Sequence, residues 1–495
     1  MRFDTRIVST ATALALLSCP IANAQPAAEA EGHAAPADTP TTAPSEVSAA
    51  GPPAPAANEQ PATPAPTAAA TAEGAVSAET APADSAAAAG DWGAFAAENA
   101  QADTPVFRTK LYGFIDTHLE KVANTPDSVD GSGRTVYASN PYELEIPNLN
   151  AMMQGSIYER YRFFLNLAGP NSGSNSDDEP LVVRNAWVEV GLFANYLNLR
   201  AGKTYRRFGL YNEILDAVPT FIGIEAPEVF DKDHLMLTRT TTLMLHGAAD
   251  LGPAVLNYSV TSGNDERTKN SVPIGADVYL DFPVGLRVGS SFYSTGGDAV
   301  PSRGIGDGSP RGGVVNWMDR DQFYVVGGYA QLKYQGLILQ TEYWRAEHRG
   351  RRNADALMQM AADANLNPKQ LSRFFENGDP SGNPILRAKY AVDAFYVRAG
   401  YEISLGDLST ITPYLQLDIY SNPETINNKD FGGDNEAGLT DNGEFEKYTL
   451  GAVIRPVPQV AFKIDGSGHR QKFNGKSEFY PEIRLSLAYL WEFSP

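Results

Sequence analysis

The stretch that decides the fold is Tyr480–Phe493, which reads YPEIRLSLAYLWEF. Side chains alternate between the two faces of an extended strand, so this pattern predicts a strand with one apolar and one polar face. The stretch is long enough for a tilted crossing of a bilayer, and its aromatic residues gather near one end, as at a membrane interface. The apolar face holds Ile483, Leu485, Leu487, Tyr489, Trp491 and Phe493, and the polar face holds Glu482, Arg484, Ser486, Ala488 and Glu492, with Leu490 as an apolar exception.

A single strand of this kind requires many others. Lipid offers no water to the backbone, so a membrane strand must be hydrogen-bonded along both edges. Tyr480–Phe493 therefore predicts a closed barrel, whose other strands should lie earlier in the chain.

Residues 1–24 predict a secretory signal peptide. Arg2 and Arg6 precede an apolar run from Ile7 to Leu17, and Ala22-Asn23-Ala24 supplies the small residues of a cleavage site. The run is shorter than the ~18 residues of a transmembrane helix. The only cysteine, Cys19, lies inside this segment, so the exported chain contains no cysteine for a disulfide or a cysteine-ligated metal site.

Residues 25–105 predict a disordered, acidic linker on the periplasmic side. The segment is rich in Ala and Pro and has eleven acidic residues but no Lys or Arg. Such a composition cannot build a packed core. Removing this segment and the signal peptide from the total charge of −20 leaves −10 for residues 106–495. This acidity argues against a nucleic-acid partner.

Residues 106–495 predict an all-β fold, a transmembrane antiparallel β-barrel of about 16 strands. Short turns alternate with long polar connections, which is the pattern of outer-membrane barrels and is unusual in soluble domains. The predicted strands are 111–122, 148–156, 160–168, 181–193, 196–204, 241–249, 254–261, 273–282, 286–294, 322–334, 337–347, 390–405, 409–420, 445–455, 459–465 and 480–493. The long connections are 123–146, 169–180, 205–240, 262–272, 295–321, 348–389, 421–444 and 466–479. Within 348–389, residues 354–366 and 368–376 predict helices that either cover the mouth or decorate the surface.

The two faces of each strand allow two interpretations. In a soluble protein the apolar face would form the core; in a barrel it faces lipid and the polar face lines a wet lumen. The pattern alone does not separate these, but the signal peptide, the loop alternation and the strand number favour the barrel. The expected inward basic residues include Arg160, Arg162, Arg200 and Arg398, and acidic residues lie among them.

The third long connection carries a family resemblance. The segment from Leu199 to Glu213 reads LRAGKTYRRFGLYNE, and together with LYGFID at 111–116 and NAWVE at 185–189 it resembles the phosphate-selective porin family. The resemblance implies a trimeric outer-membrane channel of sixteen strands with its third loop folded into the lumen. It also implies that Lys203, Arg206 and Arg207 lie near the constriction, with Lys232 and Arg239 further along the loop.

The resemblance implies passive diffusion of small hydrophilic solutes and ions, with phosphate as a candidate, across the outer membrane of a Gram-negative cell. A phosphate track needs a dense run of basic side chains, whereas here acids alternate with bases, so a general or cation-leaning pore stays open. Two alternatives are a structural barrel tethered to the cell wall through the linker and a barrel hydrolase with a Ser–His pair.

The sequence shows no enzyme, metal or cofactor motif. The histidines lack the zinc spacing, and there is no Gly-x-Ser-x-Gly elbow. The expected partners are therefore the solutes in transit, outer-membrane lipid, two further copies of the chain and the barrel-assembly machinery. We expect that machinery to use the aromatic Phe493, although Ser494 and Pro495 follow it.

Overall fold

The computed structural model describes residues 107–130, 132–169, 181–214, 220–227, 240–263, 272–297, 315, 317–362, 371–425, 441 and 443–493. The chain divides into residues 1–78 and 79–495, and every described residue belongs to the second unit. The predicted signal peptide and linker lie outside the described residues.

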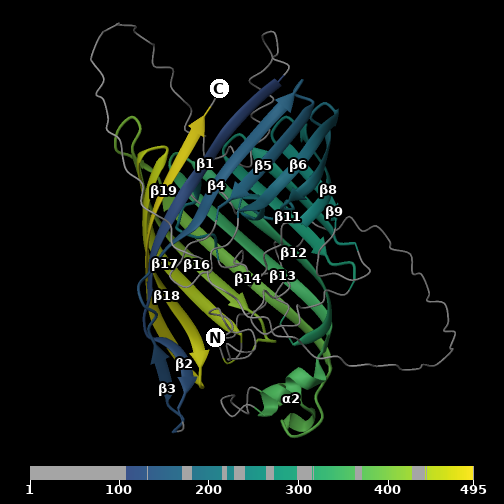
Figure 1. The fold of residues 1–495 in the computed structure, drawn as a ribbon, viewed down its shortest axis with the longest axis vertical. Helices are drawn as coiled ribbons and strands as arrows, with labels where there is room; N and C mark the ends of the chain where they lie inside the picture. Colours follow the sequence, from purple (N-terminus) through teal and green to yellow (C-terminus); the bar gives the residue numbers. More distant parts are fainter. Residues whose placement is uncertain are drawn as a thin grey trace, which may run out of the picture. The chain divides into compact units, whose positions relative to one another are not determined.

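A closed antiparallel β-barrel of sixteen strands forms most of the described part of the chain (Figure 1). The sheet has seventeen strand segments, but β15 (Ile403–Ser404) continues β14, because both pair with β16. The other segments are β1 (Phe107–Val122), β4 (Glu143–Ile157), β5 (Tyr161–Ala168), β6 (Val182–Phe193), β7 (Leu197–Thr204), β8 (Thr240–Asp250), β9 (Val255–Gly263), β10 (Ile274–Phe282), β11 (Leu286–Ser294), β12 (Met318–Tyr334), β13 (Leu337–Arg352), β14 (Arg387–Tyr401), β16 (Thr410–Ser421), β17 (Glu444–Val457), β18 (Val460–Phe473) and β19 (Lys476–Phe493). Each of the sixteen predicted strands corresponds to one of them.

The first and last strands close the barrel. β1 pairs with β4 on one edge and with β19 on the other, in a register that runs from Leu111↔Phe493 to Val122↔Glu482. Side chains reinforce this seam: the Ser486 hydroxyl donates to Asp116 Oδ1 at 2.7 Å. With β1 paired on both sides, none of the sixteen strands leaves a free edge.

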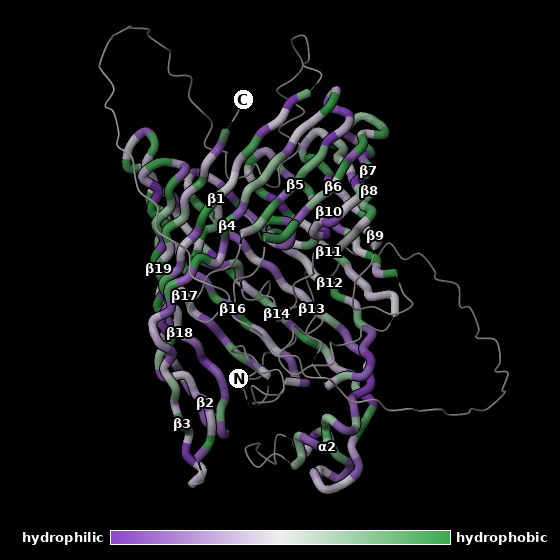
Figure 2. Tube along the Cα trace, in the orientation of Figure 1, coloured by the Kyte–Doolittle hydropathy of each residue, from purple (hydrophilic) through white to green (hydrophobic). Residues whose placement is uncertain are grey.

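Apolar side chains face outward and polar ones face inward. On β19, Leu485 and Leu487 are 41% and 43% exposed, whereas the alternating Arg484 and Ser486 are only 9% and 5% exposed. The same alternation of hydrophobic and hydrophilic residues continues along the strands around the wall (Figure 2). This is the reverse of a soluble protein, in which the charged face would be the exposed one. No helix within the described ranges is long and apolar enough to cross a membrane.

The prediction of a long connection at 466–479 is wrong. β18 and β19 extend toward each other and turn at Asn474-Gly475, where φ is +51° and +74°. Positive φ at both central residues is the geometry of a tight hairpin turn that matches the twist of the strands. The connection 123–146 also contains strands that were not predicted, β2 (Thr125–Val129) and β3 (Thr135–Ala138), which form a small separate hairpin.

The connection between β13 and β14 is only partly helical. The first predicted helix is present as α2 (Ala354–Ala362), and Asn353 Oδ1 caps it by accepting the Ala356 N–H at 2.9 Å. The second, at 368–376, is wrong in its described part, which consists of the short 3-10 turns η7 (Ser372–Phe374) and η8 (Glu376–Gly378). Phe375 has extended backbone, with φ of −124° and ψ of +147°, and bridges to Pro384, so a continuous helix cannot pass through this position.

Candidate channel lining and the third loop

The third loop crosses the inside of the barrel. Shortly after β7, the Gly209 N–H of the loop donates to Ser291 Oγ of β11 at 3.0 Å, and the Leu210 N–H donates to Glu342 Oε1 of β13 at 3.1 Å. Further along, the Gly223 carbonyl accepts from Lys463 Nζ of β18 at 2.8 Å. One segment that touches β11, β13 and β18 with their inward side chains must lie within the lumen.

Aromatic packing fixes the described part of this loop. Phe208 packs against Trp344 in a tilted arrangement with ring centroids 4.2 Å apart, and Tyr211 meets Phe221 and Tyr396 edge to face at 5.2 Å and 6.0 Å. All five rings are buried. Burying a large apolar side chain contributes about 1.5–3 kcal/mol, so Phe208 and Phe221 together hold the loop by several kcal/mol.

A charged cluster anchors the loop near its origin. The Glu189 carboxylate of β6 lies 2.8 Å from Arg200 Nε and 2.8 Å from His246 Nε2, both measured to Oε2. Its Oε1 lies 3.3 Å from Arg162 Nε. Glu213 of the loop lies 3.3 Å from Arg200 Nη1, which links the loop to this cluster. Arg200 also lies over the Trp187 ring, 4.0 Å from its centroid, which covers the guanidinium with an aromatic face.

The loop carboxylate Glu213 bridges two cations. Besides Arg200, it lies 3.3 Å from Arg207 Nε. Burial alone would raise the pKa of the Glu213 carboxyl, but the guanidinium groups of Arg207 and Arg200 lower it below its usual value. The ionised form of Glu213 is therefore the one that holds the loop.

A second anchor fixes the loop to the far wall. Arg398 of β14 donates from Nη1 to the Tyr211 hydroxyl at 2.6 Å and from Nη2 to the Glu225 carbonyl at 3.2 Å. Its Nε donates to Gln416 of β16, which orients the guanidinium toward the loop. The Tyr211 hydroxyl in turn donates to Gln340 Oε1 at 2.6 Å. Arg398 is 2% exposed, so these charge-assisted hydrogen bonds are protected from water.

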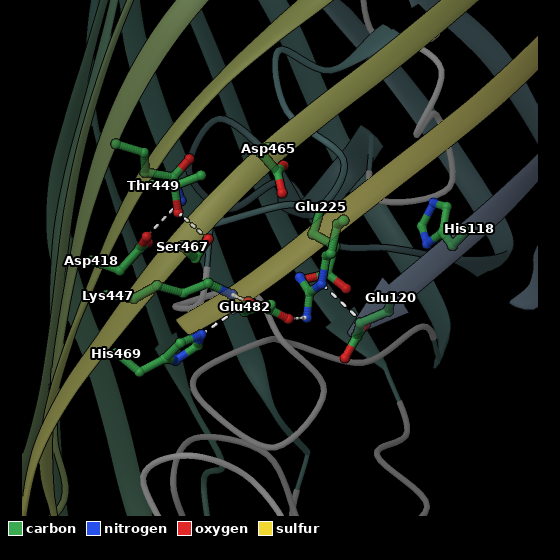
Figure 3. A network of polar contacts seen from close by, with 12 residues as sticks. His118, Glu120, Glu225, Asp418, Lys447, Thr449, Asp465, Ser467, His469 and Glu482 are labelled. Carbon is green, nitrogen blue, oxygen red and sulfur yellow. Dashed lines mark hydrogen bonds and ion pairs between the residues drawn. The ribbon is translucent and has the colours of Figure 1, made fainter. Parts of the chain in front are cut away.

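The Glu225 side chain joins a network on β1, β17, β18 and β19 (Figure 3). Arg484 is its centre and contacts Glu225, Glu120 at 3.0 Å and Glu482 at 2.5 Å. Glu482 also meets Lys447 Nζ at 3.4 Å. The lining here consists of neighbouring charges of both signs and forms no track of a single sign.

Every described histidine is paired with a buried carboxylate. The distances from imidazole nitrogen to carboxylate oxygen are 2.7 Å, 2.8 Å, 3.0 Å and 2.9 Å for the pairs His118–Asp116, His246–Glu189, His348–Asp321 and His469–Glu482. Aromatic rings cover two of the imidazoles: Tyr390 stacks on His348 at 4.3 Å and Tyr480 on His469 at 4.6 Å. The inward carboxylates are thus embedded in hydrogen bonds, which limits the bare negative charge that faces the lumen.

The predicted site residues occupy different surroundings. Arg200, Arg162 and Arg398 hold the two anchors, and Arg207 joins them through Glu213. Arg206 is 2% exposed and donates to Thr261 Oγ1 of β9 at 3.2 Å, so it lies between the loop and the wall.

The remaining predicted residues do not join this cluster. Lys203 lies on the outward face of β7, opposite Arg200, and its Nζ donates to the Val183 carbonyl at 3.0 Å. Arg160 is exposed in the short turn between β4 and β5, where its Nε donates to the Gly191 carbonyl at 3.1 Å. Lys232 and Arg239 lie outside the described residues.

The loop acids Glu213 and Glu225 and the loop Tyr211 were not identified from the sequence as site residues. Glu213 and Tyr211 follow Arg206 and Arg207 closely in the sequence, within the segment that resembles the porin family. An acidic residue so close to two arginines is a sequence signal for an ion pair. Glu225 gives no comparable signal, because its partner Arg484 is distant in sequence.

The described residues offer little support for catalysis or metal binding. No group of three or more His, Cys, Asp or Glu side chains among them could hold a metal ion. His246 faces Ser259 across β8 and β9, which is the kind of Ser–His pair that a barrel hydrolase would need. However, Ser259 is 2% exposed and its hydroxyl has no hydrogen-bond partner, so the imidazole does not activate it in this arrangement.

Comparison with solved structures returns outer-membrane proteins at low identity. The outer membrane channel DcaP of Acinetobacter baumannii is 11% identical with a TM-score of 0.45, over 79% of this chain and 99% of that one. The anion-selective porin of Comamonas acidovorans is 12% identical with a TM-score of 0.45, over 78% and 100% of the two chains. Salmonella typhi OmpF, in complex with daunomycin, is 13% identical with a TM-score of 0.43, over 77% and 97%. No protein-family model and no curated protein sequence matches the chain.

Proposed function

We propose that the chain is an outer-membrane porin that lets small hydrophilic solutes and ions diffuse passively through its lumen. One observation supports this above all: a closed barrel of sixteen strands presents apolar side chains outward and charged side chains inward. A barrel of this size encloses more space than side chains alone fill, and a polar interior keeps that space wet.

The third loop is proposed to set the width of the channel. Its contacts with Arg398, Lys463 and Arg484 hold it across the lumen from its origin at β7. A segment held in the lumen at both sides takes up part of the cross-section, and solutes must pass beside it.

We propose only a weak preference for the sign of the charge. The basic residues Arg200 and Arg207 are matched by Glu189 and Glu213, and Arg484 is matched by three carboxylates. A phosphate dianion would have to compete with these carboxylates for each cation. Phosphate selectivity therefore rests on the family resemblance and would need cations beyond these pairs.

Our proposals for the quaternary state and for biogenesis are based on the same family resemblance. We propose a homotrimer in the outer membrane whose assembly machinery uses Phe493 of β19. The mass of the detergent-solubilised protein, corrected for bound detergent, tests the trimer directly.

Single-channel conductance in planar bilayers tests the proposed function. The refolded mature chain should give stepwise openings, and the reversal potential under a salt gradient reports the charge preference. Block of the current by added phosphate would favour a phosphate-selective channel over the weak charge preference proposed here. A reversal potential near zero, without block by phosphate, would support the weak preference. A correctly folded barrel that never opens would refute the porin proposal.

A further inference from the structure

Five cations gather on the outward face of β12, β13 and β14, at the strand ends next to the long connections, which lie on the extracellular side in outer-membrane barrels. They are Arg320, Arg349, Arg351, Arg387 and Lys389, and all five are exposed. We call them the outer cationic patch. They alternate with inward, buried residues such as His348 and Ala388, so they point away from the lumen.

The strand register places these cations directly beside one another. Arg351 is opposite Arg320 on one side and Arg387 on the other, and Arg349 is opposite Lys389 in the neighbouring row. Like charges directly opposite in a sheet are destabilising. The opposed cations therefore do not stabilise the barrel itself, which points to a role in binding an anionic partner.

The next rows toward the middle of the barrel are different. Arg345 is opposite Asp393, with Nη1 3.0 Å from a carboxylate oxygen, and it also lies 3.4 Å from Glu347. Tyr324 and Tyr343 donate to these two acids at 2.6 Å each. Arg345 thus has two carboxylate partners within the chain, whereas no ion pair joins Arg349, Arg351, Arg387 or Lys389 to a described carboxylate. Lys389 acts on Glu347 only from beyond ion-pair distance.

Tyr343 and Phe395, which are opposite each other on β13 and β14, mark the height of the membrane surface, because they are the last outward aromatic residues on these strands before the charged rows; Tyr324, opposite Glu347, lies further out. Outward tyrosines form the belt at the interface between hydrocarbon and headgroups. Arg349 follows Tyr343 by six residues on β13. At about 3.3 Å per residue and a barrel tilt of about 40°, it lies about 15 Å above that belt.

This height selects among anionic lipids. Headgroups add only about 5–8 Å to each side of the hydrocarbon, so a simple phospholipid would not reach Arg349 and Lys389. A second copy of this face would bring five further cations and be repelled. Phosphates carried on the sugars of a glycolipid reach further and match the forked donors of arginine.

We propose that the outer cationic patch binds the phosphorylated sugar headgroup of a glycolipid in the outer leaflet. The proposal rests on the outer-membrane placement proposed above. It assigns a second role to the barrel wall, which is to fix the surrounding lipid to the β12–β14 face.

A pair of matched variants tests the proposal. Arg349→Gln with Lys389→Gln removes one opposed pair of the patch, and Arg470→Gln with Lys472→Gln removes two exposed cations from the outward face of β18. Full-length protein in nanodiscs of uncharged lipid is titrated with a rough lipopolysaccharide that carries phosphate on its inner-core sugars. The same lipopolysaccharide dephosphorylated on its core and inorganic phosphate serve as comparison ligands.

The patch variant should bind the phosphorylated lipopolysaccharide about 30-fold more weakly than the parent, at about fivefold per cation. The β18 variant should stay within about threefold of the parent. Equal losses in both variants, no loss in either, or equal parent binding of the dephosphorylated form would overturn the proposal. Tight binding of inorganic phosphate alone at the patch would show a free-anion site and would overturn it as well.

Two further readouts separate folding and transport from lipid binding. The patch variant should be at least as stable as the parent in detergent, because it loses a like-charge pair. Its single-channel conductance in uncharged lipid should equal that of the parent. A channel that conducts but ignores lipopolysaccharide refutes only the lipid site, whereas a silent channel that binds it refutes only the porin proposal.

Discussion

Replacing Arg398 with glutamine should release the third loop from the far wall of the barrel. The guanidinium makes two hydrogen bonds to the loop, at 2.6 Å to the Tyr211 hydroxyl and 3.2 Å to the Glu225 carbonyl. Hydrogen bonds to a charged group contribute about 1.5–3 kcal/mol each, so the change should weaken docking of the loop by about 3 kcal/mol or more. That energy corresponds to more than about a hundredfold in the equilibrium between docked and released loop.

The assay is single-channel recording of the parent and the variant in the same lipid. Released loops should appear as larger and noisier conductance steps in Arg398→Gln. Lys203→Gln is the matched control, because it also removes one positive charge from the barrel, but from the outward face of β7 and without any described contact to the loop. The control should conduct as the parent does.

Two outcomes would refute this reasoning. Unchanged conductance and noise in Arg398→Gln, with the folded state verified by its thermal transition, would mean that the far-wall anchor does not hold the loop. A larger change in Lys203→Gln than in Arg398→Gln would return Lys203 to the constriction, where the family resemblance places it.

Three further predictions concern the loop and the last strand. Acidification should loosen the loop. The pKa of Glu213 is lowered in the folded protein, so the stabilisation from its ionised carboxylate is present at neutral pH and is lost as the pH falls from the ordinary carboxyl range through that lowered pKa. Current noise should therefore rise only in acid, and noise at pH 7 as high as the noise in acid would contradict this. Phe208→Ala should cost about 3–5 kcal/mol of loop packing and raise current noise, whereas Leu487→Ala on the outward face should leave the noise unchanged, and equal records from both variants would count against the packing account. Phe493→Ala should lower the yield of assembled barrel in cells, as measured by the amount of heat-modifiable protein in outer-membrane fractions, and an equal yield would show that assembly does not depend on this residue.

The sequence was sufficient to predict the barrel, because lipid imposes a strict rule on every membrane strand. Residues such as Leu485 and Leu487 alternate with Arg484 and Ser486, and the tight turns stand out as Gly, Pro and Asn clusters. This alternation of apolar and polar side chains is required only where the strand contacts lipid. Beyond the membrane, the outward residues of β18 and β19 include Arg470, Lys472 and Ser477, so the apolar and polar alternation disappears and the sequence around the hairpin at Asn474-Gly475 has the pattern of a long loop.

The lining was harder to predict than the wall. Strand parity alone places Lys203 on the outward face, because Arg200, three residues earlier, faces inward; the family resemblance instead places Lys203 at the constriction. The partners of Arg398 and Arg484 could not be derived, because they depend on where residues 205–214 and 220–227 lie in the lumen. A loop path is set by many tertiary contacts such as Phe208 on Trp344, and no periodic pattern records them.

The seam between β1 and β19 constrains the order of events during biogenesis. Ser486 and Asp116, which meet there, are 370 residues apart in the chain. The ribosome must therefore finish almost the entire polypeptide before the first strand can meet its final neighbour. Until then both open edges are available for pairing with other chains, so we expect the unassembled protein to need periplasmic chaperones that keep it apart from them. A nonsense mutation anywhere before β19 should accordingly produce a chaperone-bound species for degradation and no smaller barrel.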